Sequence, residues 1–432
     1  MRRYYFSFWL LFLLNNMVAV ACTSLIVSGK YTNDGRSLLL KNRDTYNLYN
    51  HVLTVKGERF QYVAIVADGD SLPYAVWSGH NEAGFAIINT AAYNLNERRP
   101  ERGHGADETA LLPQDATSKR RYRLNDGAIM RRALEICGSL EDFEHFLDTL
   151  TNAEGDSNFG VIDAHGGAAY YEVGNRAGDT RGLLKWEKFD ANDKRVAPYG
   201  YIIRTNHGFS GDRERDKGVE RYLAISDYML PRGFTYQYDA REFITQIPRI
   251  LRHGLTHVDL RDYAPDDDSQ AVFQAFRDFI PRYQTSCTML IQGVKKDEEL
   301  RLTVSWTIVG SPLTTVAVPL LLTPEGDLPE LLDRRDGNGS KLNHWGLELK
   351  KKLFPLTRGS VTDYINVAAL YNKAGTGILQ KILPVEKSVL DRGEELLQRV
   401  RTSGKLDVKD VKAYYRWVDD EVYRQYHVLF GF

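Results

Sequence analysis

Cysteine is scarce in this chain of 432 residues, which contains only Cys22, Cys137 and Cys287. Exported proteins that rely on disulfides usually carry a larger, even set, so the count argues against a disulfide framework and leaves at least one thiol unpaired. Cys137 falls on the apolar face of an expected helix and Cys287 in a strand-like run, so we predict that both are small core residues. Cys22 has no such structural explanation.

The sequence also lacks an excess of one charge, because 56 Lys and Arg residues nearly balance 57 Asp and Glu residues. A nucleic-acid partner would need a basic face, so none is expected. After residue 21 no stretch approaches the roughly 20 apolar residues of a membrane span. His253 and His257 have a spacing that a metal site could use, but histidines at surfaces or helix ends are commoner. We therefore expect neither a metal nor a cofactor.

The first 21 residues have the features of a secretory signal peptide. Arg2 and Arg3 precede a short apolar core, and Ala19 and Ala21 form an A-x-A cleavage pattern. We therefore expect removal of residues 1–21 and export to the periplasm or the extracellular space. The alternatives are a short membrane anchor and a lipoprotein signal, which would place the protein on a surface through a lipid on Cys22. Ala19 argues against lipidation, since leucine is usual three residues before such a cysteine.

The remaining sequence alternates between strand-like and helical regions. Strand-like runs occur over 22–90, over 158–204 with a hairpin turn at Gly166-Gly167, and over 285–322. Helical periodicity occurs over 126–150 and 213–260, and a polar segment over 93–125 is expected to be a long surface loop or lid. This order favours an α+β fold with helices on mostly antiparallel sheets.

The C-terminal part changes character after about residue 325. Residues 327–346 are predicted to be a linker, and two long amphipathic helices follow. We interpret the chain as a main domain over 22–325 and a helical extension over 326–432. The aromatic-rich extension is expected to pack on the main domain or on a second copy, which leaves a homo-oligomer open.

Cleavage after Ala21 would give Cys22 both a thiol and a free α-amino group. The reference pKa values are about 8.5 for the thiol and about 8 for the amine, so the amine can accept the thiol proton near neutral pH. One residue then supplies the nucleophile and its base. Such a site needs an anion to orient the ammonium and donors for an oxyanion. Asp44, at the end of the second strand of the first hairpin, is placed to be that anion.

Several segments in a fixed order resemble one protein family. They are "CTSLIVSGKYTNDGRSLLLKNRD", "WSGHNEAGFAIINTAAYN", "SNFGVIDAHGGAAYYE", "IIRTNHG", "GVERYLAI" and "TVSWTIVGSPLTTVAVP", which together run from residue 22 to about 322. The sequence resembles the N-terminal-nucleophile cysteine hydrolases, which include choloylglycine hydrolases, penicillin V acylases and acyltransferase-type C45 peptidases. It is most similar to the C45-like branch. The resemblance implies a four-layer αββα sandwich of two antiparallel sheets flanked by helices.

The resemblance also implies roles for five residues. Cys22 is the nucleophile, and Asp44 holds its amine. Asn206 stabilises the oxyanion, and Arg221 supports the thiolate or Asp44 electrostatically. Asn89 is the candidate for the second oxyanion donor, for which a backbone N–H is the alternative. Taken singly, the two polar residues Asp44 and Asn206 could also be turn caps, and Arg221 a solvated helix arginine.

One position departs from the family pattern. Bile-salt hydrolases carry arginine three residues before the aspartate, whereas this chain has Lys41 there. Lysine cannot make the planar bidentate contact of arginine, so bile-salt or penicillin V specificity is not transferred. His207 follows Asn206 and is interpreted as a site-wall or structural residue, since the free amine removes the need for another base.

The expected function is therefore an exported amidohydrolase that cleaves linear amide C–N bonds, in non-peptide compounds or small peptides, through a thioester on Cys22. Two alternatives remain at this point. If an amine replaces water in the second step, the enzyme is an N-acyltransferase. If Cys22 is lipidated, the protein is an inactive, lipid-anchored binding protein that keeps the fold.

Overall fold

The computed structural model describes residues 21–69, 75–95, 123–150, 152–154, 156–174, 185–235, 238–334, 339–356 and 361–432. The expected signal peptide up to residue 20 and most of the expected loop over 93–125 lie outside these residues. Within the described parts of the chain, no helix is both long enough and apolar enough to cross a membrane.

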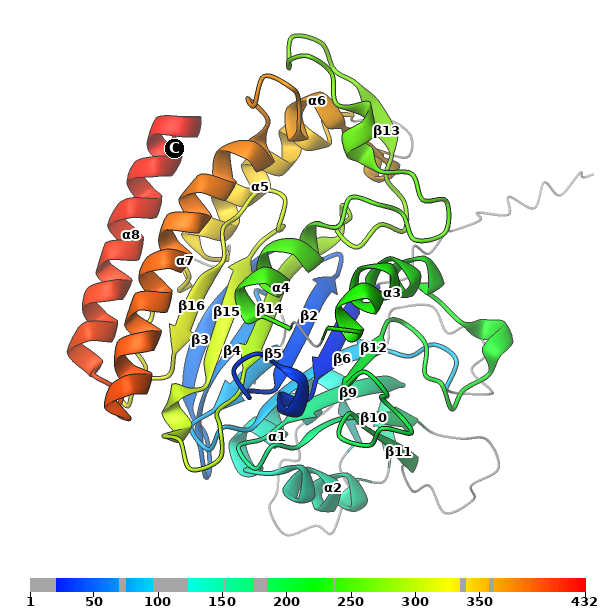
Figure 1. The fold of residues 1–432 in the computed structure, drawn as a ribbon, viewed down its shortest axis with the longest axis vertical. Helices are drawn as coiled ribbons and strands as arrows, with labels where there is room; N and C mark the ends of the chain where they lie inside the picture. The colour runs from blue at the N-terminus through cyan, green and yellow to red at the C-terminus, as the bar shows by residue number, and fades with distance from the viewer. Residues whose placement is uncertain are drawn as a thin grey trace, which may run out of the picture.

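The first sheet has six antiparallel strands and carries the start of the described chain in its interior (Figure 1). Its strands, in spatial order, are β12 (Tyr201–Arg204), β1 (Thr23–Val27), β2 (Leu38–Asp44), β14 (Thr285–Gln292), β15 (Val304–Val309) and β16 (Val318–Leu321). β1 and β2 form a hairpin in which Thr23 pairs with Asn42. β12 joins the other edge of β1, with Ser24 opposite Arg204.

The second sheet has seven antiparallel strands. Its spatial order is β11 (Lys185–Asp190), β10 (Ala168–Gly174), β9 (Ser157–Ile162), β6 (Ala86–Ala91), β5 (Val76–Asn81), β4 (Gln61–Ala67) and β3 (Asn50–Lys56). The expected hairpin is confirmed, since β9 and β10 pair around Gly166, whose φ of 86° favours glycine. Two short pairs lie outside the sheets: β7 (Arg123–Asn125) with β8 (Asn152–Glu154), and β13 (Phe273–Ala275) with β17 (Tyr364–Asn366).

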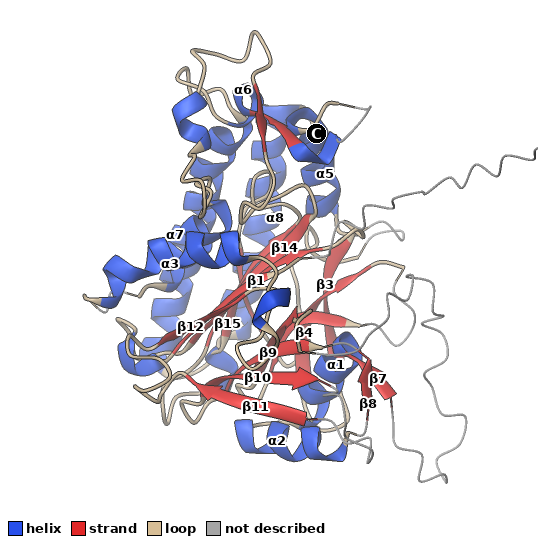
Figure 2. Cartoon of the chain, turned by 90° about the vertical axis from the view of Figure 1, so that its right-hand side faces the viewer, coloured by secondary structure: helices blue, strands red, loops and turns tan. Residues whose placement is uncertain are grey.

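Helices cover the outer faces of both sheets (Figures 1 and 2). α1 (Asp126–Ile136) and α2 (Leu140–Thr149) pack on the second sheet, where Phe143 contacts Phe159 and Tyr171 edge-on. α3 (Val219–Gly233) and α4 (Ala240–Gln246) lie over the first sheet. Apolar side chains from both sheets, such as Leu39 and Ile88, meet between them. This is the predicted four-layer αββα sandwich.

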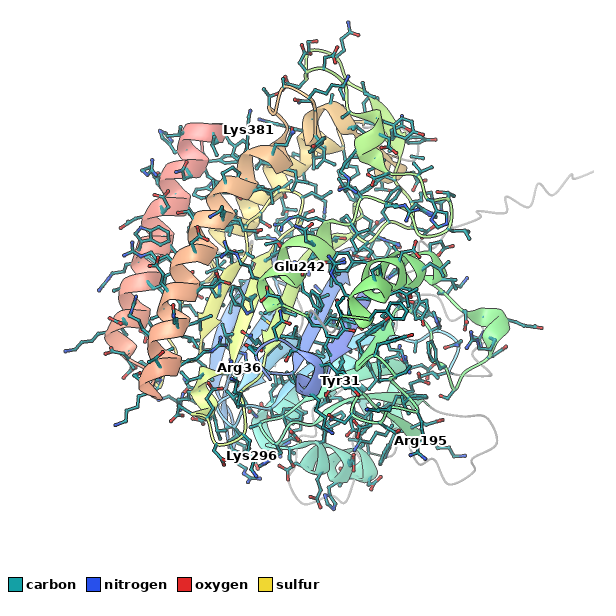
Figure 3. All side chains as sticks on the ribbon, in the orientation of Figure 1. Tyr31, Arg36, Arg195, Glu242, Lys296 and Lys381 are labelled. Atoms are coloured by element: carbon teal, nitrogen blue, oxygen red, sulfur yellow. The ribbon has the colours of Figure 1, made fainter. Side chains whose placement is uncertain are left out.

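The C-terminal region continues the helical layer over the first sheet. It contains α5 (Lys341–Leu353), α6 (Val367–Leu370), α7 (Ile378–Ser403) and α8 (Val408–Phe430). The Tyr415 hydroxyl of α8 bonds both the N–H and the carbonyl of Leu321 on β16, at 2.8 and 2.9 Å. Exposed charged side chains such as Arg195 and Lys296 lie at the periphery of the molecule (Figure 3).

One predicted element is wrong, and a second is divided in the structure. The predicted linker over 327–346 already contains the start of α5, because the Ser340 hydroxyl caps a helix by accepting the N–H of Asn343 at 3.2 Å. The helical stretch over 126–150 is two helices, since Cys137 leaves the helical conformation and Ser139 caps a second helix. The two long helices predicted after the linker are confirmed as α7 and α8.

Candidate active site

Cys22 lies directly before β1, in the interior of the first sheet, and is buried. Its neighbour Thr23 pairs with Asn42 on one side, and Ser24 pairs with Arg204 on the other. Extending the second pairing by two residues brings Asn206 opposite Cys22. The structure shows this contact, in which the Cys22 N–H donates to Asn206 Oδ1 at 2.9 Å.

Arg221 binds the same short segment from the first turn of α3. Its guanidinium donates to the carbonyl of Cys22, to Thr23 Oγ1 at 2.7 Å and to Asn206 Oδ1 at 2.7 Å. Burial lowers the pKa of Arg221 to about 10, with Arg282 adding to the effect and Asp44 and Cys22 opposing it. α3 starts after Gly218, whose φ is 75° and whose Cβ would lie 2.1 Å from Arg221 Nη2. Glycine therefore leaves the space that the guanidinium fills.

Asn206 is held at both ends of its side chain. While Oδ1 accepts from Cys22 and Arg221, Nδ2 donates to the carbonyl of Ala91 at 3.0 Å. The backbone carbonyl of Asn206 accepts from the N–H of Tyr93 at 3.1 Å. These bonds join the end of β12 to the end of β6, so both sheets fix the position of this amide.

Asp44 lies at the end of β2 and is fully buried. Its Oδ1 accepts from Thr285 Oγ1 at 2.7 Å, and its Oδ2 lies 3.2 Å from Arg282 Nε. Burial raises the pKa of Asp44, while the charges of Arg282 and Arg221 oppose that rise. The predicted contact between Asp44 and the Cys22 nitrogen is absent from this structure, in which that nitrogen belongs to the Ala21–Cys22 peptide bond and donates to Asn206. Asp44 Oδ2 accepts no hydrogen bond within the described structure.

Asn89 lies on the second sheet and contacts Lys41 rather than Cys22. Lys41 is buried and donates to Asn89 Oδ1 and, at 2.7 Å, to the carbonyl of Trp77. Asn89 Nδ2 donates to Asp126 Oδ2 at 2.6 Å. Burial lowers the pKa of Lys41, and a charge on Cys22 opposes that shift. Lys41 thus separates Asn89 from a direct role at Cys22 in this structure.

The two faces of the β1–β2 hairpin carry different groups. Lys41 pairs with Ser24, so alternation places Cys22, Ser24 and Lys41 on the face toward the second sheet, where Tyr170 donates to Ser24 at 2.7 Å. Asp44 lies on the opposite face of β2, since it is three residues from Lys41. The five predicted residues therefore form one neighbourhood, in which Cys22, Asn206 and Arg221 are in direct contact.

Sequence reasoning missed the other polar and charged residues of this neighbourhood. Arg282 and Thr285 precede or begin β14, Asp126 starts α1, and Lys350 lies in α5. The only available signal was a lysine at position 350 within the apolar stripe of a helix. His207 Nδ1 lies 2.9 Å from the carbonyl of Lys217.

The remaining thiols and histidines form no second centre in the described parts of the chain. Cys137 and Cys287 are unpaired and buried, as predicted. Burial raises the pKa of Cys137 to about 12, and it also raises that of Cys287. No group of three or more His, Cys, Asp or Glu side chains among the described residues is arranged to hold a metal ion.

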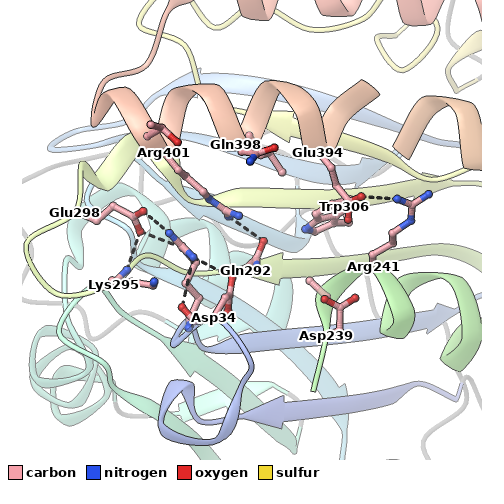
Figure 4. A pocket seen from close by; sticks show the side chains of 14 residues that line it. Asp34, Asp239, Arg241, Gln292, Lys295, Glu298, Trp306, Glu394, Gln398 and Arg401 are labelled. Carbon is pink, nitrogen blue, oxygen red and sulfur yellow. Dashed lines mark hydrogen bonds and ion pairs between the residues drawn. The ribbon is translucent and has the colours of Figure 1, made fainter. Parts of the chain in front are cut away.

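A polar pocket of about 540 Å³ lies elsewhere, at the turn end of the β1–β2 hairpin (Figure 4). Its wall includes Arg36, which pairs with Asp34 at 2.9 Å and with Glu298, and Arg401 of α7, which donates to Gln292 at 2.9 Å. Cys22 lies at the other end of β1 and is not part of this wall. The pocket is therefore separate from the candidate nucleophile.

One family of known proteins matches part of this chain. Residues 31–229 match the family described as acyl-coenzyme A:6-aminopenicillanic acid acyl-transferase. The matched segment includes Asp44, Asn206 and Arg221. The matched segment is a little under half of the chain, and the match agrees with the resemblance to the N-terminal-nucleophile cysteine hydrolases predicted from the sequence.

Structural comparison finds two acylases and a bile-acid hydrolase among the matches to this chain. Conjugated bile acid hydrolase from Clostridium perfringens is 12% identical, with a TM-score of 0.39, and the match covers 73% of this chain and 95% of that one. Penicillin V acylase from Agrobacterium tumefaciens is 13% identical, with a TM-score of 0.35 and coverages of 75% and 93%. Penicillin G acylase from Alcaligenes faecalis is 13% identical, with a TM-score of 0.30 and 51% of each chain covered. No curated protein matches the chain significantly.

Proposed function

We propose that the protein is an exported amidohydrolase whose nucleophile is the thiol of Cys22 after removal of residues 1–21. The observation that carries the proposal is the set of contacts around the main chain of Cys22. Asn206 accepts from its nitrogen at 2.9 Å, and Arg221 donates to its carbonyl. Two buried side chains thus hold the one residue whose nitrogen would become a free amine, which a merely structural cysteine would not need.

In the proposed reaction the amine of Cys22 removes the thiol proton, and the thiolate attacks the amide carbonyl carbon. The resulting ammonium protonates the leaving nitrogen as the C–N bond breaks and a thioester remains. Water then attacks the thioester while the amine takes a proton from that water. The C–S bond breaks, the acid leaves and the ammonium returns its proton to the thiolate.

The surrounding side chains support these steps. Lys41 and Arg221 are buried cations of this neighbourhood, and Arg221 donates to the carbonyl of Cys22. Asn206 orients the amine through Oδ1, and its Nδ2 carries two hydrogens, of which Ala91 takes one. The second hydrogen is offered to the oxyanion. Asp44 Oδ2, which accepts no hydrogen bond among the described residues, receives the new ammonium.

The intact mass of the mature chain and a pair of thiol variants test the proposal. The expected first residue is unmodified Cys22, and single-turnover acylation by p-nitrophenyl acetate should place one acetyl group on it. Cys22→Ala should abolish hydrolysis of fluorogenic acyl-aminocoumarin amides. Cys287→Ser is the matched control, because Cys287 is also buried and charge-coupled to Lys41 and Cys22, and it should remain active. A diacylglyceryl adduct on Cys22, or full activity of Cys22→Ala, would refute the assignment.

Acyl transfer is the second candidate, favoured by the description of the matched family as an acyl-transferase. The same thioester would then react with an amine instead of water. Adding a small primary amine to the turnover assay separates the two. Formation of the new amide at millimolar amine, at the expense of the free acid, would assign a transferase, and free acid alone would assign a hydrolase.

A further inference from the structure

The C-terminal helix α5 places a buried lysine next to the candidate site. The apolar stripe of α5 consists of Leu342, Trp345, Leu349 and Leu353, and Lys350 lies within it at 3% exposure. Moving an ammonium group out of water into the protein interior costs free energy unless polar partners there compensate the charge. The partners of Lys350 therefore indicate why a lysine occupies this position.

Lys350 contacts the segment that orients Asp44. Its Nζ donates to the carbonyl of Thr285 at 3.0 Å and lies 5.0 Å from the centre of the Tyr283 ring. Thr285 Oγ1 in turn donates to Asp44 Oδ1 at 2.7 Å and accepts from the N–H of Arg282 at 2.9 Å. A β-bulge follows Thr285, where the pairing between β14 and β2 shifts. Thr285 is thus fixed between Lys350 and Asp44.

The charges of Lys350 and Asp44 also support each other. Burial lowers the pKa of Lys350 to about 7, and the carboxylate of Asp44 opposes that shift. Burial raises the pKa of Asp44, and Arg282, Arg221 and Lys350 are the cations that oppose the rise. The charged groups near the ammonium are therefore Asp44 and the two arginines beyond it, with the Tyr283 hydroxyl as the other titratable group nearby.

We propose that Lys350 is a positioning residue of the active site, which fixes Thr285 and keeps Asp44 ionised so that Asp44 can hold the α-ammonium of Cys22. The proposal rests on the proposed function. α5 lies outside residues 31–229, the segment that matches the family. The C-terminal region is then part of the catalytic unit, and the family segment alone does not contain a complete site.

The test compares Lys350→Met with Lys351→Met in the mature full-length chain. Lys351 is the adjacent lysine of the same helix, and its side chain is 71% exposed. The readout is the rate at which p-nitrophenyl acetate acetylates Cys22, measured by mass spectrometry from pH 4 to 9. Losing a nearby cation raises a carboxyl pKa by about one unit, so the acidic limb of Lys350→Met should move up by about one pH unit. Its rate at the optimum should fall about tenfold, while Lys351→Met should match the wild type.

Two further variants separate this role from a structural one. In an Asp44→Asn background, Lys350→Met should have less than about a twofold additional effect, since interacting residues are not additive. Lys350→Gln keeps a donor for Thr285 without the charge and replaces Lys350→Met if that variant does not fold. An unchanged acidic limb in whichever folded variant is measured, or an equal effect with and without Asp44, would overturn the proposal. If the proposal for Lys350 is overturned in this way while acylation still depends on Cys22, the proposed function stands. If Cys22→Ala is acylated at the wild-type rate, the proposed function itself is rejected.

Discussion

A buried ion pair between the main body and the C-terminal region allows a quantitative prediction. Arg249 follows α4, and its guanidinium makes two parallel bonds to Glu386 of α7, at 2.8 and 2.6 Å. The side chains are only 4% and 1% exposed. Arg249 also donates to the carbonyl of Pro312 at 2.7 Å, and Glu386 accepts the N–H of Ala317 at 2.7 Å. Neither charge can be exposed to water without moving α7.

Replacing Arg249 by Met should therefore leave the Glu386 carboxylate buried with one remaining donor. Breaking a buried pair from one side costs about 3 to 5 kcal/mol of unfolding free energy. Replacing both partners, with Arg249→Met and Glu386→Leu, should cost less than Arg249→Met alone, because no unpaired charge remains. The difference in unfolding free energy between Arg249→Met and the double variant measures the cost of burying the unpaired Glu386 carboxylate.

Equilibrium urea unfolding of the mature chain, followed by tryptophan fluorescence, measures these free energies. Lys387→Ala is the matched control, since Lys387 is adjacent on α7 and makes an exposed pair with Asp391 at 2.7 Å. It should change the unfolding free energy by less than about 0.5 kcal/mol. A loss below about 1 kcal/mol for Arg249→Met, or a double variant less stable than Arg249→Met, would refute the reasoning.

Three other changes should have measurable effects in the same unfolding assay. Gly200→Ala places a Cβ 2.1 Å from the Tyr31 ring, at a backbone φ of 72°. The control Gly404→Ala, which meets no neighbouring atom, should lose only the roughly 1 to 2 kcal/mol of unfolding free energy that the left-handed conformation costs. Gly200→Ala should lose well over that amount, because the clash adds to it. Phe143→Ala should cost about 3 to 5 kcal/mol, because it empties a fully buried aromatic position under the second sheet. The pKa of Lys350 is about 7 in the folded chain, below its ordinary value, so the unfolded chain binds more protons above pH 7. Wild-type stability relative to Lys350→Met should therefore rise by about 2 to 3 kcal/mol from pH 7 to pH 9, and a flat difference would contradict the assigned burial.

The sheets could be predicted from sequence because their signals are local. Alternating or continuous apolar runs define β1 and β2, and Gly166 marks the β9–β10 turn. The layer arrangement came from the order of motifs rather than from any single run. The start of α5 was missed because its cap, Ser340, follows a charged, glycine-containing segment that resembles a linker. Helix periodicity begins only after that cap.

Candidate site residues that belong to a sequence motif could be predicted. Residues that reach the site only through long-range packing could not. Cys22 was recognised from the expected cleavage point, and Asn206 and Arg221 from motifs that follow in order. Asn89 was expected to face an oxyanion, whereas the structure places it on Lys41 and Asp126. Nothing local in the sequence marks a helix more than 300 residues after Cys22 as a neighbour of the site. The lysine at position 350 stands out within an apolar helical stripe, but that pattern alone does not assign it to the site.

The contact between Cys22 and Asn206 sets an order of events during synthesis. The two residues are 184 positions apart, and Arg221 follows still later. At about 5 to 20 residues per second, the chain needs roughly 10 to 40 s to grow from one to the other. During that interval β1 has β2 as a partner but lacks β12 on its other edge. Cys22 is therefore synthesised well before Asn206 and Arg221, the residues that contact it. Until β12 pairs with β1, the Ala21–Cys22 peptide bond is not yet enclosed by the complete sheet.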